Sequence, residues 1–174
     1  MRTEIKQLLD AIDSDAEQYD AGIQLGFILE ISNGHSVDPY HHDELTEEQL
    51  KIRLTGDEQP AIVRELLRLI ESKHPQSGSL IFITGKAAAD VIISLFQDFF
   101  LNNYAQMDNE LIYQSIIALQ NGYATQNKNI LSKLKFAELK TMFEVLTPSS
   151  DERISKHTQY CLAHLKQIQE EIDD

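Results

Sequence analysis

Apolar side chains recur every three or four residues through most of this sequence, which is the spacing of one face of an α-helix. Polar and turn-forming residues interrupt the pattern at intervals, so the chain divides into several amphipathic segments. The pattern predicts helices over about 15–32, 47–54, 58–70, 86–102, 108–121, 128–146 and 150–172.

Capping signals mark the ends of these segments. Ser14, Thr46 and Ser149 are each followed three residues later by a glutamate or glutamine, which is the arrangement of a capping box. Asp57 and Asp108 are two further candidate N-caps, because a carboxylate can accept a hydrogen bond from the first free amides of a helix. Three glycines of the kind that commonly closes a helix follow predicted segments: Gly34, Gly56 and Gly122.

Three short segments also fit β-strands, namely 23–31, 50–54 and 80–84. The first alternates apolar and polar residues, and the last is an apolar run between glycine-containing turns. The capping signals favour helix over 23–31, whereas 80–84 stays open between a strand and a buried helix. The sequence therefore predicts an all-α, single-domain multi-helix bundle over residues 1–174, with an α+β fold containing a small N-terminal sheet as the alternative.

A weak internal similarity connects three of the predicted helices. Segments 63–71, 113–121 and 158–166 share an apolar rhythm and lie 50 and 45 residues apart. This distance is close to the period of HEAT and armadillo repeats, in which helix pairs stack into a solenoid. Helical pairs of that kind and an irregular helical bundle both remain open, because amphipathic helices resemble one another.

The last predicted helix has an apolar seam that should pack lengthwise against the rest of the protein. Because its members alternate spacings of three and four residues, they form one narrow stripe, which we expect to face the core: Ile154, His157, Cys161, Leu165, Ile168 and Ile172.

Composition places the chain among ordinary globular proteins, with 42% hydrophobic and 25% charged residues. The formal net charge of −13 repels nucleic acid and anionic lipid, so neither is an expected partner. The same charge favours a basic protein partner, although acidic surfaces also serve solubility alone. A homo-oligomer is compatible with the same features.

The expected location is the cytoplasm. Charged residues begin the sequence, and no apolar run approaches the roughly 18 residues that span a bilayer. The single cysteine, Cys161, cannot form a disulfide within the chain, as suits a reducing compartment.

One segment gathers groups that bind metals. Imidazoles and carboxylates between residues 35 and 43 are ligand types of zinc, manganese and iron: His35, Asp38, His41, His42 and Asp43. However, two of these histidines are adjacent in sequence and cannot easily face one ion, and the composition is also typical of a turn. We therefore expect no metal and no other cofactor.

Other candidate motifs are better explained by structure. Glu71 and His74 match half of a dimetal carboxylate motif, but the sequence holds no second copy. Thr84-Gly85-Lys86 shares residue types with a phosphate-binding loop, which would require glycine in place of Leu80 and serine or threonine in place of Ala87. Cys161 and His157 lie on the apolar seam, where a buried thiol and a partly buried imidazole are expected rather than catalytic groups.

Helices and acidity are visible in the sequence, whereas an assembled active site is not. The leading functional hypothesis is a noncatalytic helical protein–protein interaction module of the inhibitor or immunity type. The competing hypothesis is a small metal-dependent enzyme that uses the loop from His35 to Asp43. No catalytic, cofactor-binding or metal-binding residue is assigned under the leading hypothesis.

Overall fold

The fold is all-α. The computed structural model describes residues 1–14, 19–36 and 44–173, of which helices form the dominant part, and no strand occurs among them. The described helices have these bounds: α1 Thr3–Ser14, α2 Tyr19–Ser32, η2 Gln49–Lys51, α3 Glu58–Glu71, α4 Ser77–Thr84, α5 Ala89–Val91, η3 Ile92–Phe96, α6 Gln97–Asn103, η4 Tyr104–Gln106, α7 Asn109–Tyr123, α8 Lys128–Leu131, α9 Phe136–Leu146 and α10 Glu152–Asp173.

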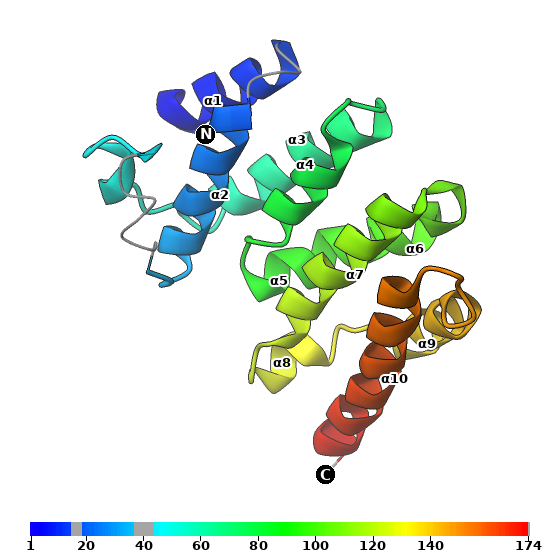
Figure 1. The fold of residues 1–174 in the computed structure, drawn as a ribbon. Coiled ribbons are helices and arrows are strands. Elements are labelled where there is room, and N and C mark those ends of the chain that lie inside the picture. Colours follow the sequence, from blue (N-terminus) through cyan, green and yellow to red (C-terminus); the bar gives the residue numbers. More distant parts are fainter. Residues whose placement is uncertain (15–18, 37–43, 174) are drawn as a thin grey trace.

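The helices form pairs that stack in two layers (Figure 1). The pairs are α1 with α2, α3 with α4, the α5–α6 stretch with α7, and α9 with α10. The second helices contact one another in the order α2, α4, α7 and α10, while the first helices form the opposite layer. One hydrophobic core runs through the stack from Ile5 to Ile168. Among the described residues, no helix has both the length and the apolar character needed to cross a membrane.

Two of the three similar segments occupy equivalent places in the stack, whereas the third lies in the other helix of its pair. Segments 113–121 and 158–166 lie in α7 and α10, which are second helices of neighbouring pairs. Segment 63–71 lies in α3, which is a first helix. The second helix of that pair is α4, whose sequence of eight residues does not show the apolar rhythm of the other two segments.

Two of the predicted strand segments are helical. Residues 23–31 belong to α2 and residues 80–84 belong to α4, where both lie against the stacked neighbours. Residues 50–51 lie in the short 3-10 helix η2, and residues 52–54 follow it without strand pairing. The α+β alternative is therefore wrong.

The N-terminal helices differ from the sequence prediction. Residues 3–14 form α1, which was not predicted, and Ser14 is its last residue rather than the cap of a helix over 15–32. The next helix begins at Tyr19, and Asp15 to Gln18 lie outside the described residues. Its predicted end is confirmed, because Gly34 has a positive φ of 83°.

The second capping box forms but supports only one turn of helix. The Thr46 amide donates to the Gln49 side chain at 2.8 Å, and the Gln49 amide donates to the Thr46 hydroxyl at 3.1 Å. These reciprocal bonds are those predicted by the sequence. The helix expected over 47–54 is reduced to η2, because the chain becomes extended at Ile52.

Two predicted helices in the C-terminal half are interrupted. The helix expected over 86–102 begins only at Ala89 and contains the π-helical turn η3. The helix expected over 128–146 is divided into α8 and α9. Between them, the backbone amide of Lys135 donates to the Gln97 side-chain carbonyl at 2.9 Å, so a residue from α6 holds this turn.

Close helix packing explains two glycines. A Cβ at Gly85 would lie 2.8 Å from Cα of Ala118, so α4 and α7 approach closely at this point. A Cβ at Gly122 would lie 2.9 Å from the Ile92 side chain. Gly122 therefore lets α7 pack closely against η3, and the prediction that it ends this helix is wrong, since α7 continues to Tyr123.

Candidate functional site

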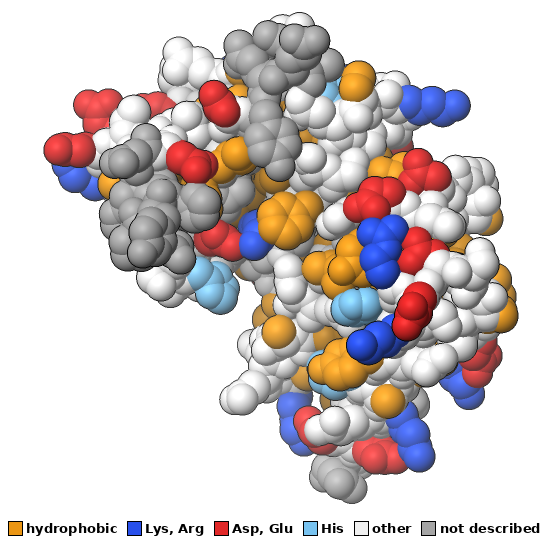
Figure 2. Space-filling view, in the orientation of Figure 1, with side chains coloured by type: hydrophobic (Ala, Val, Ile, Leu, Met, Phe, Trp, Pro, Cys, Tyr) orange, Lys and Arg blue, Asp and Glu red, His pale blue; other side chains and the backbone are white. Residues whose placement is uncertain are grey.

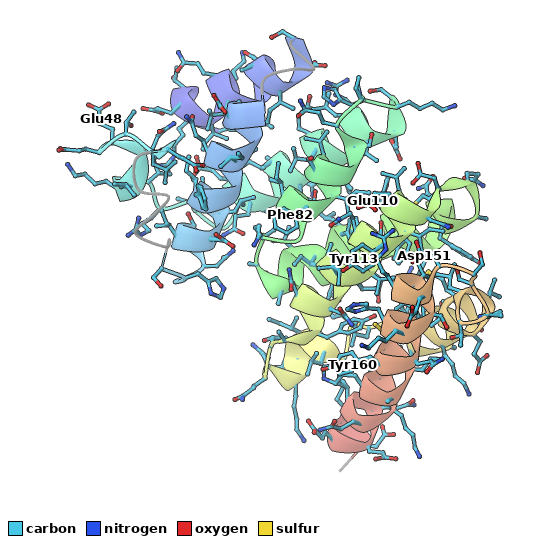
Figure 3. All side chains as sticks on the ribbon, in the orientation of Figure 1. Glu48, Phe82, Glu110, Tyr113, Asp151 and Tyr160 are labelled. Atoms are coloured by element: carbon cyan, nitrogen blue, oxygen red, sulfur yellow. The ribbon has the colours of Figure 1, made fainter. Side chains whose placement is uncertain are left out.

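The layer of second helices presents a surface that we call the front face, formed by the outward side chains of α2, α4, α7 and α10 (Figure 2). Three aromatic residues occupy successive helices of this face, with Phe82 on α4, Tyr113 on α7 and Tyr160 on α10 (Figure 3). Phe82 is 47% exposed and Tyr160 is 60% exposed, while Tyr113 is partly buried. Exposed aromatic side chains are common at the centres of protein interfaces.

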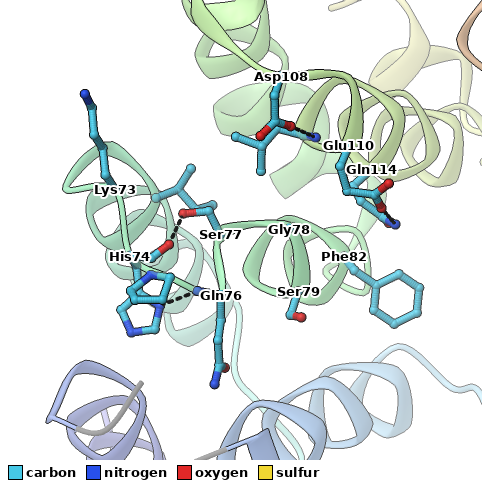
Figure 4. Close-up of a pocket in the computed structure, with 13 residues that line it drawn as sticks. Lys73, His74, Gln76, Ser77, Gly78, Ser79, Phe82, Asp108, Glu110 and Gln114 are labelled. Carbon is cyan, nitrogen blue, oxygen red and sulfur yellow. Dashed lines mark hydrogen bonds between the residues drawn. The ribbon is translucent and has the colours of Figure 1, made fainter. Parts of the chain in front are cut away.

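Phe82 lies between two hollows. The first is about 730 Å³ and is bounded by the turn between α3 and α4 and by the start of α7 (Figure 4). Lys73, Ser79, Asp108 and Glu110 give this hollow a polar lining. The second hollow is about 320 Å³ and lies between α2 and α4. Phe82 lines both hollows, so its ring forms the ridge between them.

An ion-pair cluster fixes the surroundings of Tyr113. The Arg153 guanidinium lies 4.6 Å from the centre of the Tyr113 ring and contacts Glu110 at 3.0 Å and Asp151 at 2.9 Å. The hydrogen bonds from Gln114 and then Arg153 lower the pKa of Glu110, and the bond from Arg153 lowers the pKa of Asp151. Both carboxylates therefore stay ionised at neutral pH, which makes them poor general acids.

Phe82 has a similar arrangement. Lys86 lies 4.5 Å from the centre of its ring, and Nζ of Lys86 contacts the Glu30 carboxylate at 2.5 Å. On both α4 and α7, a cation thus covers part of an aromatic ring while carboxylates neutralise its charge. The positive charges of Lys86 and Arg153 are thus balanced by neighbouring carboxylates, while the rings of Phe82 and Tyr113 stay on the front face.

The predicted metal-binding segment is only partly described. His35 is exposed and lines a separate hollow at the ends of α2, α4 and α7, with a volume of about 550 Å³. Its four proposed companions lie outside the described residues: Asp38, His41, His42 and Asp43. The described part of the chain contains no group of three or more metal-binding side chains. Metal binding by this segment stays a prediction.

His74 has a structural environment. Its Nε2 lies 2.9 Å from the carbonyl oxygen of Ile12, and its Nδ1 accepts a hydrogen bond from the Gln76 amide at 3.2 Å. These contacts join the turn between α3 and α4 to the end of α1. Glu71, the other half of the predicted motif, is exposed at the end of α3.

The residues resembling a phosphate-binding loop end α4 and begin the following turn. The Thr84 hydroxyl donates to the Leu80 carbonyl at 2.9 Å, and Lys86 is paired with Glu30. The helical end of α4 and this ion pair occupy groups that would otherwise cradle a phosphate.

The α10 seam is confirmed with two changes, because His157 is not among its buried members and Ile172 is only partly buried. Its buried members are spaced by four and three residues: Ile154, Thr158, Cys161, Leu165 and Ile168. Thr158 takes the position predicted for His157, whose ring instead meets Tyr113 edge to face at 5.5 Å. Burial raises the pKa of Cys161 to about 12, so its thiol is neutral at physiological pH and is not an activated nucleophile.

The front-face aromatics were missed at the sequence level. Phe82 lies within the apolar run 80–84, which was left open between a strand and a buried helix, and nothing in this run distinguishes the exposed Phe82 from its buried neighbours. Tyr160 did have a signal in the sequence, because it immediately precedes the seam residue Cys161 and must therefore lie off the buried stripe.

Comparison with known proteins does not assign a role. No family model matches the chain, and no curated protein or solved structure matches it.

Proposed function

We propose that this chain is a noncatalytic helical module for protein–protein interaction that binds a basic partner on its front face. The observation that carries the proposal is the exposure of Phe82 between two hollows in the middle of the stack. A half-exposed phenylalanine leaves apolar surface in contact with water in the free protein, and a partner that covers this surface gains binding free energy. The flanking hollows can accept side chains that surround such a contact.

Charge supports a basic partner. The chain carries a net charge of −13, and residues 1–58 contain 14 of its 28 acidic residues but four of its 15 basic residues. The two cations nearest the aromatic rings, Lys86 and Arg153, are already paired with carboxylates. A partner with exposed lysine or arginine would therefore be attracted to this molecule.

Three described groups with shifted pKa values, Glu110, Asp151 and Cys161, do not suit acid–base or nucleophilic catalysis, which supports a noncatalytic role for these residues. Catalytic acids, bases and nucleophiles usually have pKa values moved towards neutrality. Here the pKa values of Glu110 and Asp151 are lowered further from neutrality, and the pKa of Cys161 is raised to about 12. An inhibitor or immunity-type protein needs no chemistry of its own, because it acts by covering a surface of another protein.

The proposed location is the cytoplasm. Cys161 is a buried free thiol, and a reducing compartment keeps such thiols unpaired. Partner binding is proposed for one copy of the chain, and light scattering of the purified protein would show whether it forms a homo-oligomer.

Affinity capture from the native source tests the proposed function. Wild-type bait should retain a basic protein that high salt elutes, and Phe82→Ala bait should retain at least about tenfold less of it. Val145→Ala is the matched control, because Val145 is 57% exposed but lies on α9 in the opposite layer. Equal retention by the Phe82→Ala and wild-type baits, or retention of acidic proteins only, would refute the proposal.

A further inference from the structure

The two halves of α10 are held in different ways. In its first turns, Arg153 pairs with Glu110 of α7 at 3.0 Å. The Thr147 hydroxyl donates to the Thr158 hydroxyl at 3.2 Å, which joins the end of α9 to the second turn of α10. From Tyr160 onward, no ion pair joins α10 to another helix in the part of the chain that the structure describes. The C-terminal end of this half projects past the neighbouring helices (Figure 1).

Two polar side chains are buried beneath this second half of α10. Tyr123, the last residue of α7, is 2% exposed, and its hydroxyl is buried with no hydrogen-bond partner among the described residues. Cys161 is fully buried, and its sulfur accepts a hydrogen bond from the Gln120 side chain at 3.4 Å. Because thiol sulfur is a weak acceptor, this bond contributes little. The contact between α7 and α10 thus includes an unsatisfied hydroxyl and a weak hydrogen bond.

The Tyr123 hydroxyl keeps its proton in this environment. Burial, and after it the nearby Cys161, raise the pKa of Tyr123 well above its ordinary value. The His164 ring meets the Tyr123 ring edge to face, with 6.1 Å between the ring centres. A neutral hydroxyl that is withdrawn from water without a partner costs free energy, which is regained when water reaches it. The closed arrangement of α10 therefore has a cost that an open arrangement removes.

We propose that α10 opens locally from Tyr160 to Asp173 while its first turns stay attached, and that the buried Tyr123 hydroxyl promotes this opening. A single helix can open at a lower free energy than the whole protein where few contacts hold it. The Lys128 side chain donates to the Glu171 carbonyl near the end of α10, but this bond is exposed, so water can replace it. Opening moves Tyr160 away from Phe82 and Tyr113, so it changes the aromatic surface of the front face. The inference concerns the free protein and does not depend on the proposed function.

Alkylation of Cys161 by iodoacetamide, followed by mass spectrometry, measures this opening, because Cys161 is the single cysteine of the chain. In the closed arrangement, burial excludes the reagent and raises the thiol pKa to about 12, so little thiolate is present. We expect alkylation at low urea to be faster than global unfolding allows. Its rate should depend only weakly on urea, since local opening exposes less surface than global unfolding. Alkylation that follows global unfolding at every urea concentration would overturn the proposal.

Removing one hydroxyl tests the role of Tyr123. Tyr123→Phe keeps the ring and should slow alkylation of Cys161 about tenfold without urea, because the closed arrangement loses its unsatisfied group. Tyr104→Phe is the matched control, since Tyr104 is partly buried but lies in η4, outside both α7 and α10. This control should alkylate at the wild-type rate. Equal rates for the wild type and Tyr123→Phe would overturn the proposal.

A core substitution far from α10 separates local from global opening. Leu9 is 3% exposed in α1, at the other end of the stack (Figure 1), so Leu9→Ala should lower the urea midpoint of global unfolding. Because α10 opens on its own, the rate of Cys161 alkylation at low urea should stay at the wild-type value. Acceleration in proportion to the lost global stability would show that Cys161 reacts only after global unfolding, which contradicts the proposal.

Discussion

At the scale of single residues, the start of α3 is held by Glu58 and Arg2 rather than by the predicted cap. The sequence indicates Asp57 as the cap of α3, but its side chain makes no capping hydrogen bond. Glu58 instead accepts hydrogen bonds from Arg2 at 2.7 and 2.9 Å and from the Thr55 amide at 2.9 Å. The Arg2 interaction is the main cause that lowers the pKa of Glu58 to about 2. This contact joins the start of the chain to α3.

Acid should weaken this contact. The unfolded chain has the ordinary Glu58 pKa near 4.5 and the folded chain a pKa of about 2, so the stabilisation is complete above pH 4.5 and is lost as pH falls through 2. Arg2 is 32% exposed, so screening should limit the cost of Glu58→Gln to about 1 to 2 kcal/mol at neutral pH. Urea unfolding at pH 7 and pH 2 should show this difference shrinking with acid. A difference that is unchanged at pH 2 would exclude the assigned ion pair.

The histidine-rich segment has its own test. If its histidines are turn residues, replacing His35, His41 and His42 together by alanine should change the unfolding free energy by less than about 0.5 kcal/mol. Purified protein without an affinity tag should contain no stoichiometric zinc, manganese or iron. Elemental analysis that finds one of these metals in wild-type protein, and loses it in the triple variant, would support the metal-dependent alternative instead.

At the scale of helices, the sequence predicts those elements whose signals are local. Asp108 caps α7 as expected, with its carboxylate accepting from the Leu111 amide at 2.9 Å. The division between α8 and α9 was not predictable locally, because no glycine or proline marks it and Gln97 of α6 stabilises the turn. Helix α1 could have been predicted from the spacing of Ile5, Leu9 and Ile12, all of which are buried.

The site was less predictable than the fold. Exposure of Phe82 depends on the place of α4 between α2 and α7, which the pattern within residues 80–84 does not contain. The Arg153 cluster joins the start of α10 to Glu110 of α7, residues that lie far apart in the sequence. Periodicity identifies the buried face of a helix, whereas an interaction surface depends on how several helices are stacked.

The α10 seam should be essential for stability. Leu165 is 4% exposed within the core, so Leu165→Ala should cost about 2 to 5 kcal/mol. Lys166→Ala is the matched control and should cost less than about 0.5 kcal/mol, because its side chain is 80% exposed and its pairing with Glu170 is loose at 3.8 Å. Urea denaturation should separate the two variants clearly. Small and equal losses would show that the seam does not pack against the core.

At the scale of the whole molecule, the stack separates two tasks. The core between the layers holds the helix pairs together, and the two chain termini lie at opposite ends of the stack (Figure 1). The front face places aromatic rings and carboxylates from different pairs on one surface (Figure 3). The negative charge is unevenly distributed along the chain, since residues 1–58 hold half of the acidic residues. A basic partner would therefore be attracted towards the N-terminal pairs, where α2 and α4 form their hollow.

Amide hydrogen exchange, measured with and without the captured basic partner, is the most direct test of the proposal that the front face binds this partner. We expect slower exchange in α4 and in the neighbouring turns of α2 and α7, because a partner covering Phe82 would stabilise these segments against local opening. Exchange in α3 and α9 of the opposite layer should change little. Slower exchange confined to α3, α6 and α9, with α4 unchanged, would contradict the account.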